Sequence, residues 1–443
     1  MTLNARTGSL SVIETRRILS ELINQLIKEG YEKNGAITKE TILLEDALSR
    51  ILAEDLLSPM HVPNADNSAM DGYAFQGGID DPSEPEQKKL KIVGTAFAGT
   101  PYLGHVGNQE CVKVMTGALM PAACDTVIPQ ELITKIITNS HQESELLFPR
   151  NAVKTGENRR LQGEDLHLGQ VAIPAGRILR PSDLGLAASL GINTLSVRRK
   201  LRVAILSSGN ELRSLNQALD SGSVYDSNRY SLIGLLTRLN LEIIDCGIVQ
   251  DDPIALKEAF SAATLKADVL ISSGGVSAGE ADFTKQVLQE LGDIGFWQIA
   301  MRPGRPMAFG LLKPILNSPN PQETQSSTLF FGLPGNPVAV MVTFYQFVRA
   351  ALLQLNGATQ TTIPALQVRA GEAIRKKPGR TEFQRGIVTL DDTGQTSVRT
   401  TGSQGAGILR SMSEANCFIV LPAEQGNIEV GDLVTVEIFE GLL

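Results

Sequence analysis

The central third of the chain alternates between short apolar runs and segments with helical spacing, and this alternation constrains the fold more than any other feature. Apolar runs occur in LRVAIL, EIIDCGIV, DVLIS and LFFGL, and helical patterns such as SLIGLLTRLN separate them. Strands that alternate with helices predict a three-layer α/β domain with a mainly parallel sheet. We place this domain at residues 198–357.

The two flanking regions carry different patterns. Residues 1–197 have helical spacing near both ends and a β-rich lobe at about 72–165, where short β-branched runs are broken by Gly and Pro. Residues 358–443 lack helical spacing and contain short strands separated by turns, which predicts a small β-barrel or sandwich, and we assign a C-terminal β-barrel. The predicted fold class is therefore multidomain α/β and β, with helical and β-rich N-terminal lobes.

Composition and single-residue counts disfavour several classes of protein. The chain has 40 basic and 48 acidic residues, a net charge of −8, and no basic cluster that would bind nucleic acid. Its four cysteines form no C-x-x-C pair and its four histidines no H-E-x-x-H motif, so a disulfide framework and a zinc hydrolase are disfavoured. The N-terminus has no apolar signal core, and we expect no run of the roughly 18 apolar residues that a membrane span needs. We therefore predict a cytoplasmic protein with no membrane partner.

Three glycine-containing turns follow apolar runs of the α/β domain: SSGNEL at 207–212, SSGGVSAGEAD at 272–282 and GLPGNP at 332–337. The carboxyl ends of parallel strands share one edge of a sheet, so we expect these turns to meet where α/β domains bind ligands. Serine hydroxyls and glycine amides there could hold a phosphate or a polar ring. The residues that could do so are Ser272, Gly274, Gly275, Ser277, Gly335 and Asn336. For any single turn, strand-to-helix geometry alone is a sufficient explanation, and neither a G-x-G-x-x-G nor a P-loop motif is present.

Acidic residues accompany these turns. Glu211, Asp251 and Asp282 are expected at the same edge, where they would repel a phosphate unless a cation intervened. Carboxylates together with phosphate oxygens are ligands that suit Mg²⁺. We therefore predict Mg²⁺ bound by these three acids, although helix capping could explain Asp251 or Asp282. Arg302 and Arg305, in the loop MRPGRP, would bind an oxyanion or else belong to a solvated basic loop.

Three stretches of the N-terminal region are too polar for a core. NADNSAMDGYAF contains Asp71, VMTGALMP contains Thr116, and GENRRLQGEDL contains Asp165. Taken alone, such stretches are typical of surface loops with capping residues.

Eight motifs follow one another along the chain: NSAMDGYA, VMTGA, GENRRLQGEDL, SSGNEL, YDSNRY, SSGGVSAGEADFTK, MRPGRPMAFG and GLPGNPVA. In this order they resemble the motifs of the MoeA family, the molybdopterin molybdenumtransferases, which are related to the E domain of gephyrin. The resemblance runs from about residue 11 to 439. It implies a MogA-like central domain and an enzyme of molybdenum cofactor biosynthesis. Such an enzyme inserts molybdate into adenylylated molybdopterin, with Mg²⁺-dependent hydrolysis of the adenylate to AMP. It also implies a homodimer and possible contact with a molybdopterin adenylyltransferase.

The resemblance also implies roles for individual residues. The catalytic set comprises Asp71, Thr116, Asp165, Glu211, Asp251 and Asp282. The ligand-binding set comprises Ser272, Gly274, Gly275, Ser277, Arg302, Pro303, Arg305, Pro306, Gly335, Asn336 and Arg385. Arg302 and Arg305 stand where the family has lysines, and Gln298 stands where some members have a lysine that would bind molybdate.

Two alternatives remain open at this stage. A molybdopterin adenylyltransferase uses a similar α/β domain, but there that domain suffices alone, without the long flanking regions. A non-enzymatic pterin carrier or scaffold would have no use for so many acids beside a phosphate.

Overall fold

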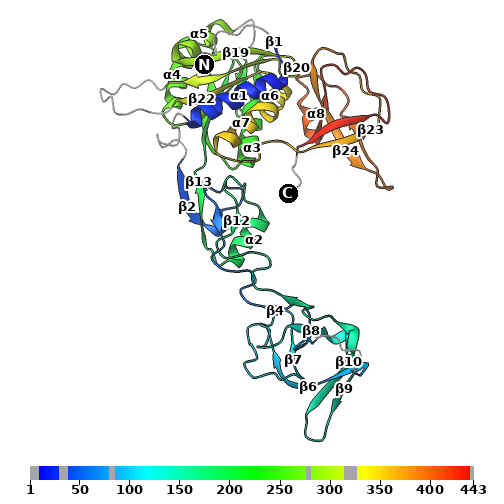
Figure 1. The fold of residues 1–443 in the computed structure, drawn as a ribbon. Coiled ribbons are helices and arrows are strands. Elements are labelled where there is room, and N and C mark those ends of the chain that lie inside the picture. The colour runs from blue at the N-terminus through cyan, green and yellow to red at the C-terminus, as the bar shows by residue number, and fades with distance from the viewer. Residues whose placement is uncertain (1–8, 29–37, 79–84, 276–280, 314–326, 440–443) are drawn as a thin grey trace, which may run out of the picture. The chain divides into compact units, whose positions relative to one another are not determined.

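We describe a computed structural model of the chain over residues 9–28, 38–78, 85–275, 281–313 and 327–439, with the side chains of residues 281–283 excepted. The chain forms two compact units (Figure 1). Unit 1 comprises Met1–Glu54, Ala175–Gly185 and Ile192–Leu443, and unit 2 comprises Asp55–Pro174 and Leu186–Gly191.

A seven-stranded sheet is the centre of unit 1 in the described part of the chain, in the order β1-β19-β21-β22-β18-β14-β17. The strands are β1 (Ser9–Leu10), β14 (Arg202–Ser208), β17 (Glu242–Val249), β18 (Val269–Ser273), β19 (Gly292–Ile299), β21 (Pro306–Leu312) and β22 (Thr328–Leu333). Only β21 runs against the others, because it pairs antiparallel with both of its neighbours. The predicted α/β domain with a mainly parallel sheet is confirmed.

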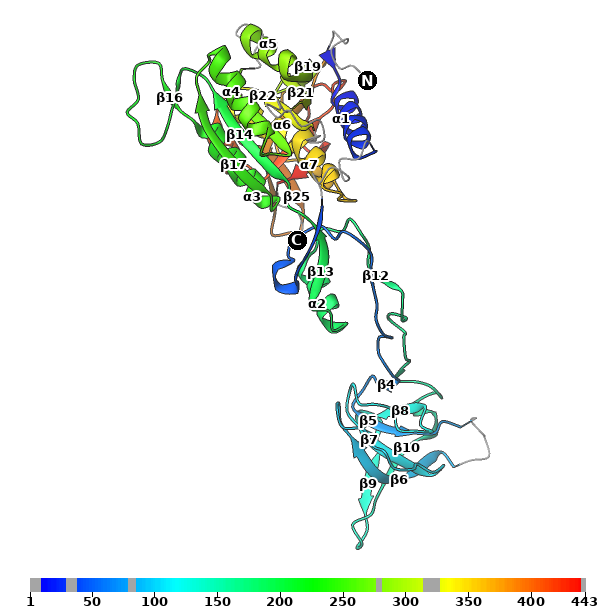
Figure 2. The ribbon, with the colours of Figure 1, turned by 90° about the vertical axis from the view of Figure 1, so that its left-hand side faces the viewer.

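Helices cover both faces of this sheet (Figures 1 and 2). They are α1 (Val12–Leu26), α3 (Ser227–Arg238), α4 (Pro253–Thr264), α5 (Ala281–Leu291), α6 (Pro337–Thr343), the π-helical η6 (Phe344–Val348) and α7 (Arg349–Leu355). Successive side chains of a strand point to opposite faces. Val203 and Ile205 of β14 therefore pack with α1, α3, α6 and α7, while Ala204 and Leu206 pack with α4 and α5.

The continuous helix Pro337–Leu355 is long and apolar enough to cross a membrane by length and composition. The expectation that no segment reaches this length was therefore wrong. However, 72% of its apolar window is buried inside the protein, and its residues Val340, Phe347 and Leu352 belong to the core of unit 1. This burial is typical of a core helix in a globular domain.

The C-terminal part of unit 1 is a closed five-stranded barrel, as predicted. Its strands are β23 (Ala365–Ala370), β24 (Thr381–Leu390), β25 (Thr396–Thr400), β26 (Cys417–Leu421) and β27 (Leu433–Ile438). Closure occurs because β24 pairs with β26 through its first half and with β25 through its second half. The short strand β20 (Met301–Arg302) joins the start of β24, and α8 (Leu409–Glu414) packs beside them.

The remaining strands of unit 1 form two small ribbons. β2 (Lys39–Leu43) pairs with β13 (Thr194–Arg198), and β15 (Leu212–Arg213) pairs with β16 (Val224–Tyr225). The 3₁₀ turn η3 (Leu44–Asp46) follows β2, and α2 (Pro181–Ser189) starts in unit 1 and ends in unit 2.

Unit 2 contains a six-stranded sheet in the order β8-β5-β7-β6-β10-β9. Its strands are β5 (Gly72–Phe75), β6 (Gln87–Ala96), β7 (Glu110–Val114), β8 (Thr126–Pro129), β9 (Lys135–Thr138) and β10 (Ser144–Pro149), with the 3₁₀ turns η4 (Gln130–Leu132) and η5 (Arg150–Ala152). Two ribbons complete it, β4 (Asn67–Ser68) with β11 (Arg159–Arg160) and β3 (Leu56–Leu57) with β12 (Val171–Ile173).

Candidate functional site

The carboxyl ends of β14, β18 and β22 lie side by side, so the three glycine-containing turns begin at one edge of the central sheet. Ser207 pairs with Ser273, and Ser273 pairs with Leu333, in register across the three strands. The turns also touch, because the Gly274 amide donates to the Leu333 carbonyl at 3.2 Å. We call this region the carboxyl edge.

The turn after β18 needs glycine at two positions. Gly274 has φ +90° and Gly275 has φ +68°, a conformation that side chains disfavour. A Cβ atom on Gly274 would lie 2.4 Å from the Ser208 carbonyl oxygen, and one on Gly275 would lie 3.0 Å from Ser208 Oγ and from Thr284 Oγ1. The turns after β14 and β18 can therefore approach each other only with glycine there.

Two predicted residues of this turn are not described fully. Ser277 lies outside the described residues. The backbone of Asp282 belongs to the first turn of α5, but its side chain lies outside the described part. Ser272, the remaining predicted ligand residue of the turn, is buried at the end of β18.

Glu211 and Asp251 follow β14 and β17, and both are exposed at the carboxyl edge. The Glu211 carboxylate folds back over its own turn, because a Cβ atom on Gly209 would lie 2.7 Å from both of its oxygens. The Asn210 side-chain oxygen accepts a hydrogen bond from the Asp251 amide at 3.3 Å, which ties the two turns together. Among the side chains that the structure describes, no three His, Cys, Asp or Glu groups are close enough to hold a metal ion. Asp282, the third predicted metal ligand, has its side chain outside this described set.

The loop with Arg302 and Arg305 reaches the same edge because β21 is reversed. β19 ends at this edge, and the antiparallel β21 begins there at Pro306. The Arg305 carbonyl accepts from the Ile299 amide at 2.7 Å, which closes the loop. Pro303 is buried while both arginines are exposed, so the loop holds two cationic side chains at the surface.

Arg385 in β24 lies near Arg302, but it is only 1% exposed. Its Nε donates to Ser411 Oγ at 3.0 Å and its Nη2 donates to the Gly405 carbonyl at 3.1 Å. Burial, and then the positive charge of Arg302, lowers the pKa of Arg385 to about 10. The group is therefore a buried cation at neutral pH.

The turn after β22 is held by a residue that the sequence reasoning did not single out. Asn228 in the first turn of α3 donates from Nδ2 to the Gly335 carbonyl at 2.7 Å. Asn336 precedes α6, but its side chain makes no capping hydrogen bond and is exposed. Asn228 could have been found from the sequence, since it stands four residues before Leu232 and seven before Leu235, on the apolar face of the helix.

Several buried side-chain oxygens near this edge have no hydrogen-bond partner within the described structure. They are Ser208 Oγ, Ser272 Oγ, Asp226 Oδ2 and Asn228 Oδ1. Buried polar groups in folded proteins are nearly always paired, so a group of such atoms at one edge indicates a binding region.

The predicted catalytic residues of unit 2 are described within that unit. Asp71 Oδ1 accepts from both the amide and the hydroxyl of Thr116, each at 2.7 Å. These two hydrogen bonds, first from the amide and then from the hydroxyl, lower the pKa of Asp71. Asp165 is exposed, and its amide donates to the Val62 carbonyl at 3.0 Å.

Comparison with known proteins decides the family. The chain matches the MoeA N-terminal region (domain I and II) over residues 10–191, a probable molybdopterin binding domain over 204–354, and the MoeA C-terminal region (domain IV) over 367–439. The molybdopterin molybdenumtransferase of Haemophilus influenzae is 41% identical over 406 residues, which cover 91% of this chain and 95% of that protein. The chain belongs to the MoeA family.

Two further relatives agree with the MoeA assignment. Gephyrin of Dictyostelium discoideum is 30% identical over 453 residues, which cover 94% of this chain and 61% of that protein. The crystal structure of the molybdopterin biosynthesis moeA protein from Pyrococcus horikoshii OT3 superposes with a TM-score of 0.76 at 25% identity, covering 98% of this chain and 100% of that chain. Both the predicted family and the predicted MoeA fold are confirmed.

Proposed function

We propose that this MoeA-family chain is a molybdopterin molybdenumtransferase that inserts molybdate into adenylylated molybdopterin and releases AMP. The observation that carries the proposal is the carboxyl edge, along which three neighbouring turns, two exposed acids and a cationic loop all lie. An enzyme that cleaves a phosphoanhydride needs charge neutralisation and positioning more than a covalent nucleophile. These residue types supply both.

The residues at the edge suit Mg²⁺. Exposed carboxylates such as Glu211 and Asp251 would each provide an oxygen ligand, with phosphate oxygens of the substrate completing the shell. When bound, Mg²⁺ would neutralise the phosphate charge. Arg302 and Arg305 would orient the oxyanion, because a guanidinium group presents several donors in a fixed plane.

The match over all three regions supports this reaction over the two alternatives. An adenylyltransferase would need only the α/β domain, whereas this chain matches MoeA from residue 10 to residue 439. A carrier would not need exposed acids at a phosphate-binding edge.

The proposal is tested by incubating the purified chain with adenylylated molybdopterin, Mg²⁺ and molybdate, and following AMP by chromatography. We expect AMP release that molybdate stimulates and that chelation of divalent ions stops. A parallel reaction with ATP and bare molybdopterin tests the adenylyltransferase alternative. Absence of molybdate-stimulated AMP release from the wild-type chain would count against the proposal.

Homodimerisation, contact with a molybdopterin adenylyltransferase and a cytoplasmic location belong to the same proposal. Sedimentation of the purified chain would test the first of these, since a dimer would have twice the 47.6 kDa mass of the chain.

A further inference from the structure

We propose that Asp226 and Asn228, at the start of α3, bind the N–H groups of the pterin ring; this inference rests on the proposed function. The two residues stand two positions apart in the sequence, and each has one buried oxygen without a partner in the described structure. Asp226 is 2% exposed and Asn228 is 9% exposed. Neither residue was among the predicted ligands.

The position of this pair follows from its hydrogen bonds. The Asp226 amide donates at 3.1 Å to the carbonyl of Arg213, which lies in the ribbon that follows β14. Asn228 Nδ2 donates to Gly335, in the turn that follows β22. Since β18 lies between β14 and β22, the start of α3 bridges the turns on either side of the β18 end. The pair therefore belongs to the carboxyl edge, at the start of a helix that contacts the turns on either side of the one formed by Gly274 and Gly275.

In each side chain one polar atom is hydrogen-bonded, and this bond holds the other polar atom in place. Asp226 Oδ1 accepts from the Arg229 amide at 3.1 Å and so caps α3, while Oδ2 remains unpaired. In Asn228 the amide nitrogen is bonded to Gly335, while Oδ1 remains unpaired. Each residue thus presents an acceptor in a fixed direction.

The chemistry of these atoms selects the part of the ligand that they bind. A carboxylate oxygen and an amide oxygen only accept hydrogen bonds, and a buried carboxylate would repel a phosphate or molybdate. The ligand must therefore present N–H donors. The pterin ring carries a 2-amino group beside N3–H, two adjacent donors that suit neighbouring acceptors, whereas adenine offers only its 6-amino group.

Asp252 provides a matched control. It caps α4 as Asp226 caps α3, because its Oδ1 accepts from the amides of Ile254 and Ala255. Asp252 is exposed, however, and carries no buried unpaired oxygen. Substitutions at both positions change a helix cap, but only those at Asp226 change the proposed contact.

The experiment uses calorimetry to measure the binding of three ligands to the full chain: 6-hydroxymethylpterin, 6-hydroxymethyllumazine and AMP. The lumazine has a carbonyl in place of the 2-amino group of the pterin. Asp226→Ser keeps a capping side chain and removes the unpaired oxygen. Asp226→Asn keeps the shape and exchanges an acceptor for a donor. We expect both variants to bind the pterin on the order of 10- to 100-fold more weakly, to lose the preference for pterin over lumazine, and to bind AMP as the wild type does. Asp252→Ser and Asp252→Asn should change none of the three affinities.

An unchanged pterin affinity in both Asp226 variants would overturn the inference, as would a loss confined to AMP, which would place adenine at this pair instead. Thermal unfolding of the same variants shows whether a loss of binding follows from a loss of folding. The inference and the proposed function fail separately, because molybdate-stimulated AMP release by the wild type tests only the latter.

Discussion

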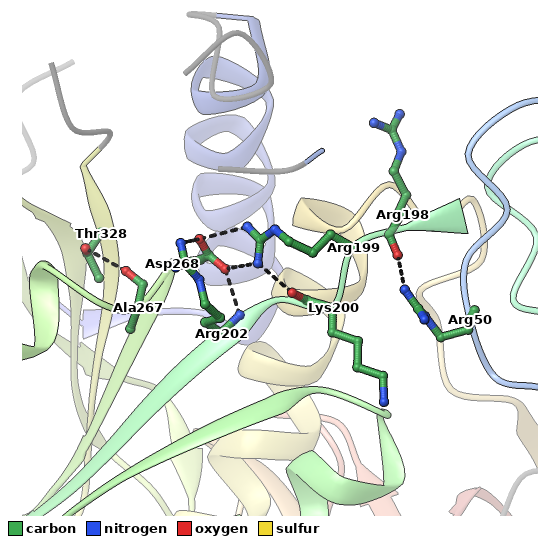
Figure 3. A network of polar contacts seen from close by, with 8 residues as sticks. All are labelled: Arg50, Arg198, Arg199, Lys200, Arg202, Ala267, Asp268 and Thr328. Atoms are coloured by element: carbon green, nitrogen blue, oxygen red, sulfur yellow. Dashed lines mark hydrogen bonds and ion pairs between the residues drawn. The ribbon is translucent and has the colours of Figure 1, made fainter. Parts of the chain in front are cut away.

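The two edges of the central sheet differ in how many of their buried polar atoms are paired. At the amino edge, Asp268 precedes β18 and its side chain is 2% exposed. Its two oxygens accept four hydrogen bonds of 2.7–3.2 Å from Arg199 and Arg202 (Figure 3). Beside it, Thr328 Oγ1 donates to the Ala267 carbonyl at 3.1 Å. The unpaired Nε of Arg202 is the exception there.

At the carboxyl edge, four residues further along β18, the buried hydroxyl of Ser272 has no partner in the described structure. The same strand therefore begins beside an acid whose two oxygens are both paired, and near its other end it carries the unpaired hydroxyl of Ser272, although the next residue, Ser273, shares a hydrogen bond with Ser207 at 3.1 Å. Because an unpaired buried polar atom costs free energy, we infer that the amino edge maintains the fold and the carboxyl edge binds a ligand. The following variants test that division.

The largest effect on stability is expected from Asp268→Ala. Loss of the carboxylate removes four hydrogen bonds and leaves the partly exposed guanidinium groups of Arg199 and Arg202 without their acidic partner, which should lower the free energy of unfolding by about 2–3 kcal/mol. The single tryptophan of the chain, Trp297 in β19, is buried and reports urea unfolding of this domain by fluorescence. Activity per folded molecule should be preserved. A stable Asp268→Ala variant without activity would contradict the assignment of a purely structural role to the amino edge.

Glu211→Gln should lower activity and leave stability unchanged. We expect AMP release to fall roughly 100-fold, since charge neutralisation by a metal is worth several kcal/mol, while the urea midpoint stays unchanged. The control is Glu242→Gln, because Glu242 is an exposed acid at the amino end of β17. If both variants lose activity equally, the acid at the carboxyl edge has no special role.

A pair of hydroxyl deletions sharpens the comparison further. Thr328→Val removes a buried hydroxyl that is hydrogen-bonded and should lower the free energy of unfolding by about 1 kcal/mol. Ser272→Ala removes a buried hydroxyl that is unpaired, so stability should not fall, while substrate binding should weaken. Equal destabilisation by both variants, measured by Trp297 fluorescence, would show that Ser272 has a structural partner after all.

The smallest effect concerns Asp71 in unit 2, a paired acid among the predicted catalytic residues. Thr116→Ala removes one of its two donors, so the pKa of Asp71 should rise toward the ordinary value of 3.8. Because the folded-state pKa is lowered, the stabilisation exists above pH 3.8 and is lost as the pH falls through the folded-state pKa below it. NMR titration of the Asp71 carboxyl carbon measures this. Thr155→Ala, whose hydroxyl donates to the Gly78 carbonyl, should leave it unchanged.

The carboxyl edge could be predicted from the sequence because it follows from patterns within short stretches of the chain. Each apolar run was followed by a glycine-containing turn, and parallel strands place such turns together. The caps at Asp226 and Asp252 were also predictable, since each precedes a run of helical spacing and Asp252 is followed by Pro253.

The features that the sequence did not predict depend on contacts between distant residues. Asp268 and Arg199 are 69 positions apart, and Asp71 and Thr116 are 45 apart. The reversal of β21 was not predicted either, because its apolar run resembles those of the parallel strands of the sheet. The contact of Asn228 was not predicted because its partner, Gly335, is 107 positions away.

The closed C-terminal barrel limits how this domain can meet another chain. Each strand of the ring is hydrogen-bonded on both sides over part of its length, and the stretches paired on one side only are short, such as residues 387–390 of β24 and 365–368 of β23. Such short stretches offer little backbone to a foreign strand, so we expect recognition through this domain to depend mainly on side chains and loops, where a single substitution can change the choice of partner without disturbing the backbone.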